Sequence, residues 1–258
     1  MLTISILLLP TPGAIGDPDE NEEQENKSIL SSSIKPANED PEVYTLDTWK
    51  SKVRGSQQGD KLIGVLNNLD ASLVRNFRDV HSLYMRGHLY GTVGCTNAAI
   101  VDLTKVIQTE HANLLAANAY CERGICFFDN ANYDRAIKDL DKAVELNPNS
   151  GDARLARGRL LLWLGKPLAA LTDLLCARYE NLDFATPLPG ELPANHYRAP
   201  DYYLGVCYEA LNRPQDALYY YKEASNLPST HGAGYLHRYA EQPADVAECV
   251  SRLGGRLY

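Results

Sequence analysis

The stretch ANAYCERGICFFDNANYDRAIKDLDKAVELNPNS, residues 117–150, contains the strongest pattern in this chain. Alanines and larger apolar residues recur in it three or four positions apart, as on one face of an α-helix. The stretch ends in Asn147-Pro148-Asn149, where the proline prevents a helix from continuing. The pattern predicts helices that stop near residue 148.

Parts of this stretch recur elsewhere in the chain. The dipeptide Arg123-Gly124 is followed 34 residues later by Arg157-Gly158. Arg86-Gly87 lies 37 residues before Arg123-Gly124. A related dipeptide, Leu204-Gly205, lies 47 residues after Arg157-Gly158. A period of 34 residues, interrupted by short insertions, indicates a repeat protein built from pairs of helices.

With residue 117 as position 1, the repeat resembles the tetratricopeptide repeat (TPR) family. The matching residues are Tyr120, Gly124, Phe127, Ala136, Leu140, Ala143 and Pro148, and only Arg123 departs, at a position where the family has leucine. The resemblance covers four units, 80–113, 117–150, 151–184 and 198–231. It implies an all-α fold, a right-handed α-solenoid of about four helix-turn-helix units with helical caps.

The small residue at position 8 has a physical role in this pattern. A glycine there allows the first helix of a unit (helix A) to approach the second (helix B) closely. A bulky residue at this position overpacks the interface, so we expect Gly124→Leu to destabilise the fold. One unit cannot bury its own apolar faces, whereas four stacked units can.

The flanks of the repeats carry weaker signals. Residues 46–79 are predicted to form N-terminal capping helices or a degenerate extra unit, and residues 232–258 a C-terminal capping helix region. Residues 183–197 contain three prolines and a glycine, which exclude a regular helix. This loop is either a solvent loop or a segment that folds over the binding face.

The N-terminus suggests export. Residues 2–9 form an apolar run of signal-peptide length, too short to span a bilayer, but no basic residue precedes it. We favour an exported, periplasmic or secreted, chain with a signal peptide over residues 1–15, against a cytoplasmic chain with an apolar tag. Residues 16–45 are predicted to be a disordered acidic spacer.

The resemblance also implies where a partner would bind. In the family, side chains at positions 2, 5, 9, 12 and 13 of the A helices line a concave face. Aromatic residues and arginine, which are enriched at binding hot spots, occupy several of these positions. The candidate partner-binding residues are Tyr84, His88, Phe128, Arg159, Trp163 and Tyr202. The alternative for each of them is packing against the adjacent helices.

Several functions find no support in the sequence. One TPR subfamily clamps the C-terminal carboxylates of chaperones with lysines, asparagines and an arginine, but the corresponding positions here hold Tyr84, His88, Glu122, Asp152 and Ala156. A chaperone C-terminal tail is therefore not expected as the ligand.

Catalysis, cofactors and nucleic acid are likewise not expected. There is no glycine-rich phosphate loop, no nucleophile motif and no cysteine or histidine cluster with metal-ligand spacing. Most of the formal charge of −8 lies in residues 1–45, which hold nine acidic and two basic residues, so the repeats present no basic face for nucleic acid. The sequence predicts a scaffold or adaptor that binds a peptide or protein, or alternatively a self-associating structural or envelope accessory component without a peptide ligand.

Overall fold

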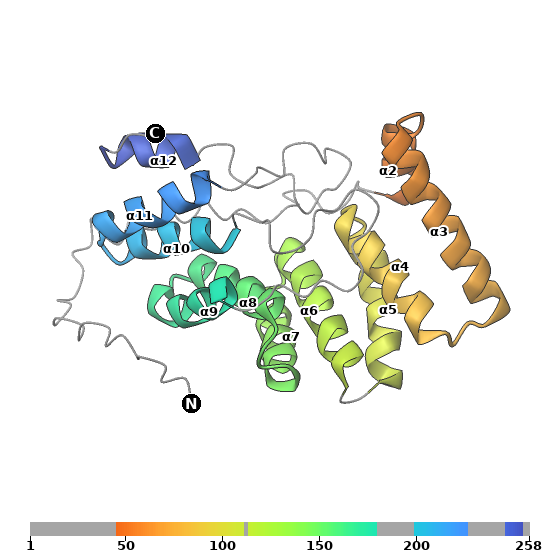
Figure 1. Cartoon of the computed structure of the whole chain (residues 1–258). Coiled ribbons are helices and arrows are strands. Elements are labelled where there is room, and N and C mark those ends of the chain that lie inside the picture. The colour runs from red at the N-terminus through yellow and green to blue at the C-terminus, as the bar shows by residue number, and fades with distance from the viewer. Residues whose placement is uncertain (1–44, 111–112, 180–198, 227–245, 255–258) are drawn as a thin grey trace, which may run out of the picture.

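The computed structural model describes residues 45–110, 113–179, 199–226 and 246–254, and within these ranges every regular element is a helix. Four helix pairs follow one another across the molecule in Figure 1. They are α4 (Val80–Thr92) with α5 (Thr96–Thr109), α6 (Leu114–Asp129) with α7 (Tyr133–Leu146), α8 (Gly151–Trp163) with α9 (Pro167–Tyr179), and α10 (Ala199–Ala210) with α11 (Pro214–Ser225). We call these pairs the first to fourth units. The prediction of an all-α solenoid is confirmed.

Each turn from helix A to helix B contains one residue with a left-handed backbone, always at repeat position 15. These residues are Gly94 (φ 86°), Ala131 (φ 55°), Gly165 (φ 69°) and Asn212 (φ 53°). Glycine lacks a Cβ and the asparagine side chain can hydrogen-bond locally, so both tolerate this conformation, which is costly for alanine. The shared turn reverses the chain in the same way in all four units.

The glycine at position 8 sets the distance between the two helices of a unit. A Cβ on Gly124 would lie 2.9 Å from Leu140, and one on Gly158 would lie 2.8 Å from Leu174. Gly87 stands in the same relation to Leu103, at 2.9 Å. In each case the residue met is at position 24 of helix B, so the close approach expected from the sequence is present.

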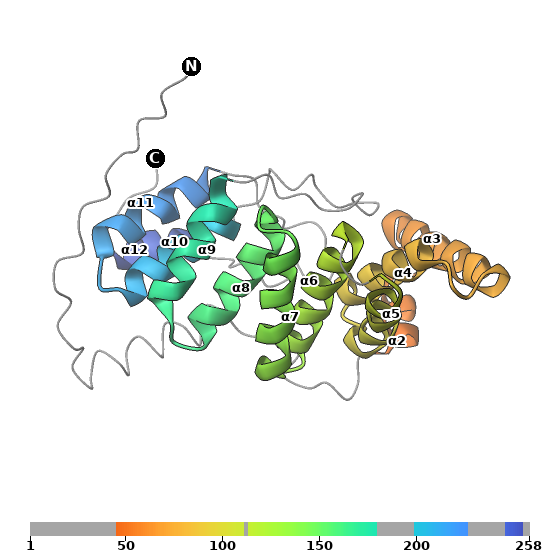
Figure 2. The same cartoon turned by 90° about the horizontal axis from the view of Figure 1, so that it is seen from below.

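The A helices form the inner side of the solenoid. Helix α6 contacts α4 and α8, and α8 also contacts α10, whereas no two B helices are among the helix pairs in substantial contact within the described chain. Since the A helices pack together while the B helices are spread apart, the stack curves around the A side. Figure 2 shows the pairs from below, in the same succession.

Within the described residues, two helices precede the repeats and one follows them. Helix α2 (Leu46–Val53) packs on α3 (Gln57–Arg75), and α3 packs on α4, with Trp49, Leu62 and Leu66 buried. Helix α12 (Val246–Arg252) packs on α11 through Val246 and Val250. Residues 1–15, the spacer except for Thr45, and the loop 183–197 lie outside the described residues.

Candidate functional site

Arg159 lies on α8, where three A helices meet. Its guanidinium carbon is 5.7 Å from the centre of the Phe128 ring on α6 and 5.2 Å from the centre of the Tyr203 ring on α10. Both rings are buried. Cation–π attraction acts over such distances, so the two rings fix the guanidinium between the second and fourth units.

An aromatic cluster adjoins this arginine. The Phe128 ring lies 6.3 Å from Trp163, one helical turn beyond Arg159 on α8, and 6.0 Å from Tyr133, the first residue of α7. Tyr133 and Trp163 are themselves 6.0 Å apart. Phe128 is buried, while Trp163 and Tyr133 are partly exposed. We call Phe128, Tyr133, Arg159, Trp163 and Tyr203 the Arg159 site.

The arginines at repeat position 7 behave differently from Arg159. Arg86 donates from Nε to Asp102 (2.7 Å), Arg123 from Nε to Asp139 (2.7 Å) and Arg157 from Nε to Asp173 (2.6 Å). A second bond from Nη2 makes each pair bidentate. The partner is always at position 23 of helix B. These three arginines therefore connect the two helices of their own units.

The same arginines also connect consecutive units. Nη1 of Arg86 donates to Asp70 on α3, and Nη1 of Arg157 donates to Asp141 on α7, at 2.7 and 2.9 Å. Bonding to these carboxylates raises the pKa of both arginines, with Asp102 and Asp173 as the largest causes. Asp70 precedes Arg86 by the same number of residues as Asp141 precedes Arg157. Helix α3 thus occupies the place of a B helix in front of the first unit.

Of the remaining predicted residues, Tyr84 and His88 lie on α4, and the Tyr202 ring centre lies 5.2 Å from that of Tyr203 in the Arg159 site. Tyr84 and His88 stack on one another on α4, with ring centres 6.2 Å apart, and His88 Nδ1 lies 3.2 Å from Glu122 on α6. Tyr202 lies against Tyr221, with ring centres 5.7 Å apart. Tyr84, His88 and Tyr202 are all buried. A role for these three in partner binding stays a prediction, whereas Phe128, Arg159 and Trp163 are brought together.

Comparisons with known proteins place this geometry in a family. The tetratricopeptide repeat model matches residues 117–150, the second unit. The human mitochondrial import receptor subunit TOM70 is 32% identical over 93 residues, which are 36% of this chain and 15% of that protein. A bovine SGT1 homolog is 39% identical over 61 residues, 24% of this chain and 17% of that protein.

Solved structures share the fold over most of this chain. A tetratricopeptide repeat protein from Parabacteroides merdae has a TM-score of 0.52 at 16% identity, covering 91% of this chain and 79% of its own. A TPR protein from Thermus thermophilus has a TM-score of 0.51 at 15% identity, covering 90% and 98%. This chain contains a tetratricopeptide repeat and has the fold of tetratricopeptide-repeat proteins. Proteins of this family are protein-interaction scaffolds and are typically not enzymes. The TPR protein described here spans less than a fifth of the length of the curated relatives it matches.

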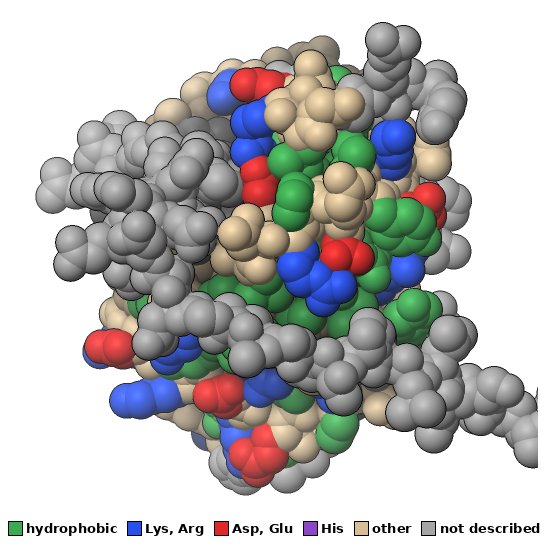
Figure 3. Space-filling model, turned by 90° about the vertical axis from the view of Figure 1, so that its left-hand side faces the viewer, with side chains coloured by type: hydrophobic (Ala, Val, Ile, Leu, Met, Phe, Trp, Pro, Cys, Tyr) green, Lys and Arg blue, Asp and Glu red, His purple; other side chains and the backbone are tan. Residues whose placement is uncertain are grey.

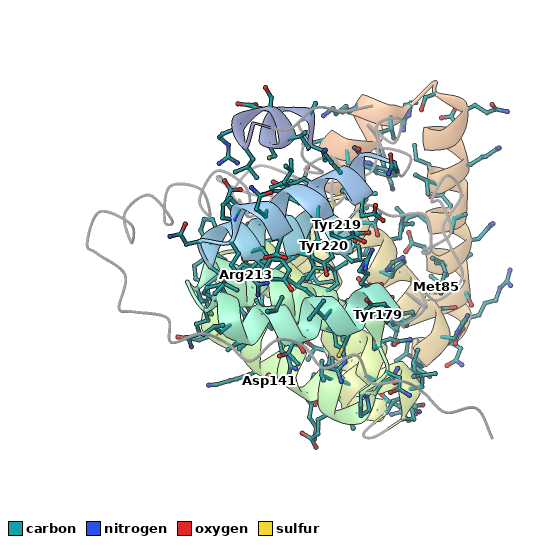
Figure 4. All side chains as sticks on the ribbon, turned by 60° about the vertical axis from the view of Figure 1, so that its left-hand side comes forward. Met85, Asp141, Tyr179, Arg213, Tyr219 and Tyr220 are labelled. Atoms are coloured by element: carbon teal, nitrogen blue, oxygen red, sulfur yellow. The ribbon has the colours of Figure 1, made fainter. Side chains whose placement is uncertain are left out.

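The outer surface of this TPR protein has a second group of aromatic residues, on α9, α10 and α11. We call it the tyrosine face, and it comprises Arg178, Tyr179, Tyr208, Arg213, Tyr219 and Tyr220. Figure 4 shows Tyr179, Tyr219 and Tyr220 near one another, with Arg213 at the start of α11. Tyr179 is 77% exposed and Tyr219 is 52% exposed. Figure 3 views this end of the TPR protein, where hydrophobic side chains lie among charged ones.

Stacking holds the centre of the tyrosine face. The Tyr208 and Tyr220 rings are 5.2 Å apart and nearly parallel, and Arg178 lies 5.2 Å from the centre of Tyr220. Burial raises the pKa of Tyr220 to about 12, so this phenol is neutral near pH 7. Tyr221, the next residue, is fully buried in the core, as repeat position 24 predicts.

The described residues contain no group of three or more histidine, cysteine, aspartate or glutamate side chains arranged to hold a metal ion. No described helix combines the length and the apolar character needed to cross a bilayer. The described cysteines, from Cys95 to Cys249, form no disulfide bond with one another.

Sequence reasoning missed two members of the Arg159 site, Tyr133 and Tyr203. Tyr133 begins a B helix, so the concave positions of the A helices do not include it. Tyr203 follows the predicted Tyr202 and faces Arg159, while Tyr202 faces Tyr221. A search for aromatic residues at the start of each B helix would have detected Tyr133.

Proposed function

We propose that this TPR protein is an adaptor that binds a peptide segment of another protein on its inner face, at the Arg159 site. The observation that carries the proposal is the convergence of α6, α8 and α10 on one arginine and one partly exposed tryptophan. Tryptophan, tyrosine and arginine are the residue types that dominate binding energy in protein interfaces.

The surroundings of the Arg159 site favour binding without large rearrangement. Phe128 and Tyr203 are buried, so the rings that support Arg159 are already fixed by the packing of three units. A preorganised site loses less conformational entropy when a ligand binds. Trp163 retains exposed surface that an apolar ligand side chain would cover. Burial of that surface would supply the hydrophobic part of the affinity.

A displayed library of random dodecapeptides, selected on the immobilised full chain, tests this function. The selected peptides are then synthesised and titrated against the parent, Trp163→Ala and Tyr179→Ala by fluorescence anisotropy. We expect Trp163→Ala to weaken binding about tenfold or more, as hot-spot truncations do. Tyr179→Ala, which removes an exposed tyrosine from the outer surface, serves as the matched control and should bind as the parent does.

The interpretation requires that both variants fold. Their thermal unfolding, followed by circular dichroism, is compared with that of the parent before binding is measured. Peptides that lose affinity for Tyr179→Ala and retain it for Trp163→Ala would contradict the inner-face adaptor and assign binding to the tyrosine face. Failure to select any peptide would also contradict it.

A second candidate function is self-association through the tyrosine face. The specific observation in its favour is the exposure of Tyr179 and Tyr219, two large aromatic side chains of the tyrosine face. Exposed apolar patches of this kind often mark protein contacts. Sedimentation velocity of the parent and Tyr179→Ser/Tyr219→Ser tests it, since a dimer should dissociate in the double variant.

A further inference from the structure

We infer that the ligand segment carries a carboxylate, and that this carboxylate pairs with the guanidinium of Arg159. This inference rests on the proposed function, because it names the chemistry that the Arg159 site recognises. It begins from a difference between Arg159 and the other arginines of the repeats.

Arg159 has a positive charge that the described part of the chain does not neutralise. Its Nε is buried and has no hydrogen-bond acceptor, and its described interactions are the two ring contacts. Arg86, Arg123 and Arg157, on the same set of A helices, all donate to a carboxylate through Nε. A buried donor loses its hydration and gains nothing in return unless an acceptor reaches it.

The two ring contacts determine the environment of the Arg159 guanidinium. Phe128 and Tyr203 lie 5.7 and 5.2 Å from the guanidinium carbon and supply apolar surroundings, in which an ion pair is stronger than in water. The planar fork of arginine matches the two oxygens of a carboxylate, and such bidentate pairs are short and strong.

The neighbouring aromatic cluster adds a second requirement. Trp163 is one helical turn from Arg159 and contacts Phe128 and Tyr133. A peptide that places a carboxylate on Arg159 would bring its adjacent residues over Trp163. The site therefore fits a segment in which an acidic group lies next to a large apolar side chain.

The test uses three pools of fluorescent heptapeptides whose other positions are randomised among neutral residues. The first pool has a central glutamate and both ends capped, and the second replaces this glutamate with glutamine. The third keeps the glutamine but has a free C-terminal carboxylate. Each pool is titrated against the full-length parent, Arg159→Gln and Arg159→Lys, and anisotropy reports the average affinity.

We expect the parent to bind a carboxylate-bearing pool about tenfold more tightly than the capped glutamine pool, which is the size expected of one charge-assisted pair. Arg159→Gln should abolish this preference, and Arg159→Lys should keep part of it. If the first pool binds better than the third, the carboxylate belongs to a side chain, and the reverse order assigns it to a chain end.

Arg135 provides a matched control. It lies over the Phe127 ring at 5.6 Å, is exposed, and belongs to α7 on the outer side of the solenoid. Arg135→Gln removes the same charge and the same type of contact, and should leave the preference for carboxylate unchanged. Thermal unfolding of the three variants establishes that each is folded.

The outcomes separate this inference from the proposed function. Equal binding of all three pools to the parent, still weakened by Trp163→Ala, would overturn the carboxylate and leave the adaptor function intact. A preference that persists in Arg159→Gln would also overturn the inference. No binding of any pool to the parent would contradict both.

Discussion

In the first three units, an arginine at repeat position 7 pairs with an aspartate at position 23, whereas the fourth unit has Leu204 and Tyr220 at these positions. In the first three units the two residues form a charge pair, and its aspartate is at most 7% exposed. In the fourth unit, Tyr220 stacks on Tyr208 and Leu204 is fully buried.

The fourth unit also differs from the others in how it is linked to its neighbours. The arginines of the first and third units also reach a carboxylate on the preceding helix, α3 or α7, so the charge pair links neighbours along the stack. The fourth unit is linked instead through Arg178 of the third, whose Nε lies 2.6 Å from Asp201. On its far side, Arg252 of α12 donates to Glu209. The last unit thus exchanges the internal charge pair for contacts at its two ends.

The largest expected effect comes from removing one partner of a buried charge pair. Arg123→Leu leaves Asp139 buried without its cation, and such a loss costs about 3 kcal/mol or more in the free energy of unfolding. The double variant Arg123→Leu/Asp139→Tyr installs the residues of the fourth unit in the second. We expect the double variant to recover most of the stability, because apolar replacements of buried ion pairs are often neutral.

Urea denaturation monitored by circular dichroism measures both variants. A double variant no more stable than Arg123→Leu would show that the two arrangements are not interchangeable. That result would show that a leucine and a tyrosine can replace the charge pair only in the surroundings of the fourth unit.

The next effect concerns the glycine at position 8. A Cβ on Gly124 would lie 2.9 Å from the Leu140 side chain, while one on Gly205 would lie 2.5 Å from the Tyr221 ring. Overpacking of a core costs about 1–3 kcal/mol, and a buried ring yields less easily than a leucine. Gly124→Leu and Gly205→Leu should therefore both destabilise the protein, with the larger loss at Gly205.

Gly64 on α3 is the control, because a Cβ there would meet nothing within 4 Å. Gly64→Leu should be neutral or stabilise the protein slightly, since leucine favours helix more than glycine. Thermal unfolding followed by circular dichroism compares the three variants. A Gly124→Leu protein that unfolds like the parent would refute the repeat register.

The repeat register was predictable from the sequence because it depends on local spacing. A period of 34 residues, the glycine at position 8 and the large residue at position 24 lie within one unit, and their contacts are short in sequence. The same spacing contains a further signal. Arg123 departs from the family pattern, and an aspartate follows the arginine at position 7 by 16 residues in each of the first three units.

The candidate site was less predictable because it joins different units. Arg159 contacts Phe128 and Tyr203, which lie 31 and 44 residues away in the sequence, the latter beyond the insertion 183–197. Which side chains are buried also depends on how neighbouring units pack. Tyr202 sits at a position that faces the partner in the family pattern, yet its ring lies against Tyr221.

A smaller effect is expected at the Tyr221 hydroxyl, which distinguishes the fourth unit from the others. Tyr221 donates to Glu209 Oε2 at 2.8 Å, while the residues at the same repeat position in the first three units are leucines. Burial raises the pKa of this phenol, so it remains a donor across the pH range of the experiment. Tyr221→Phe should cost about 1 kcal/mol, the net contribution of one such bond.

Amide hydrogen exchange measures which helices lose stability in Tyr221→Phe. Faster exchange should be confined to α10, α11 and α12, because Glu209 also accepts from Arg252 of α12. Leu140→Ile, a substitution in the second unit at the same repeat position, provides the comparison and should leave α12 unchanged. Uniform acceleration across all units after Tyr221→Phe would contradict a local role.

The smallest effect contrasts two aspartates in the first and fourth units. Asp79 caps α4, and bonds donated to it, chiefly by the Ser82 hydroxyl, lower its pKa below 3.8. Burial raises the pKa of Asp201 above 3.8, against the opposing effect of Arg178. A lowered pKa adds stability that is present above pH 3.8 and is lost as the pH falls below it. A raised pKa has the opposite sign, so protonation of Asp201 stabilises the fold as the pH falls towards 3.8.

Melting temperatures of Asp79→Asn and Asp201→Asn between pH 3 and pH 7 test this contrast. Asparagine keeps the shape of aspartate and lacks its charge. Near pH 7, Asp79→Asn should melt below the parent and Asp201→Asn above it, each by on the order of 1 °C. Both differences should shrink near pH 3, where the parent carboxyl groups become protonated. Shifts of equal sign near pH 7 would show that Arg178 outweighs the burial of Asp201, and that the two ends of the stack respond to acid alike.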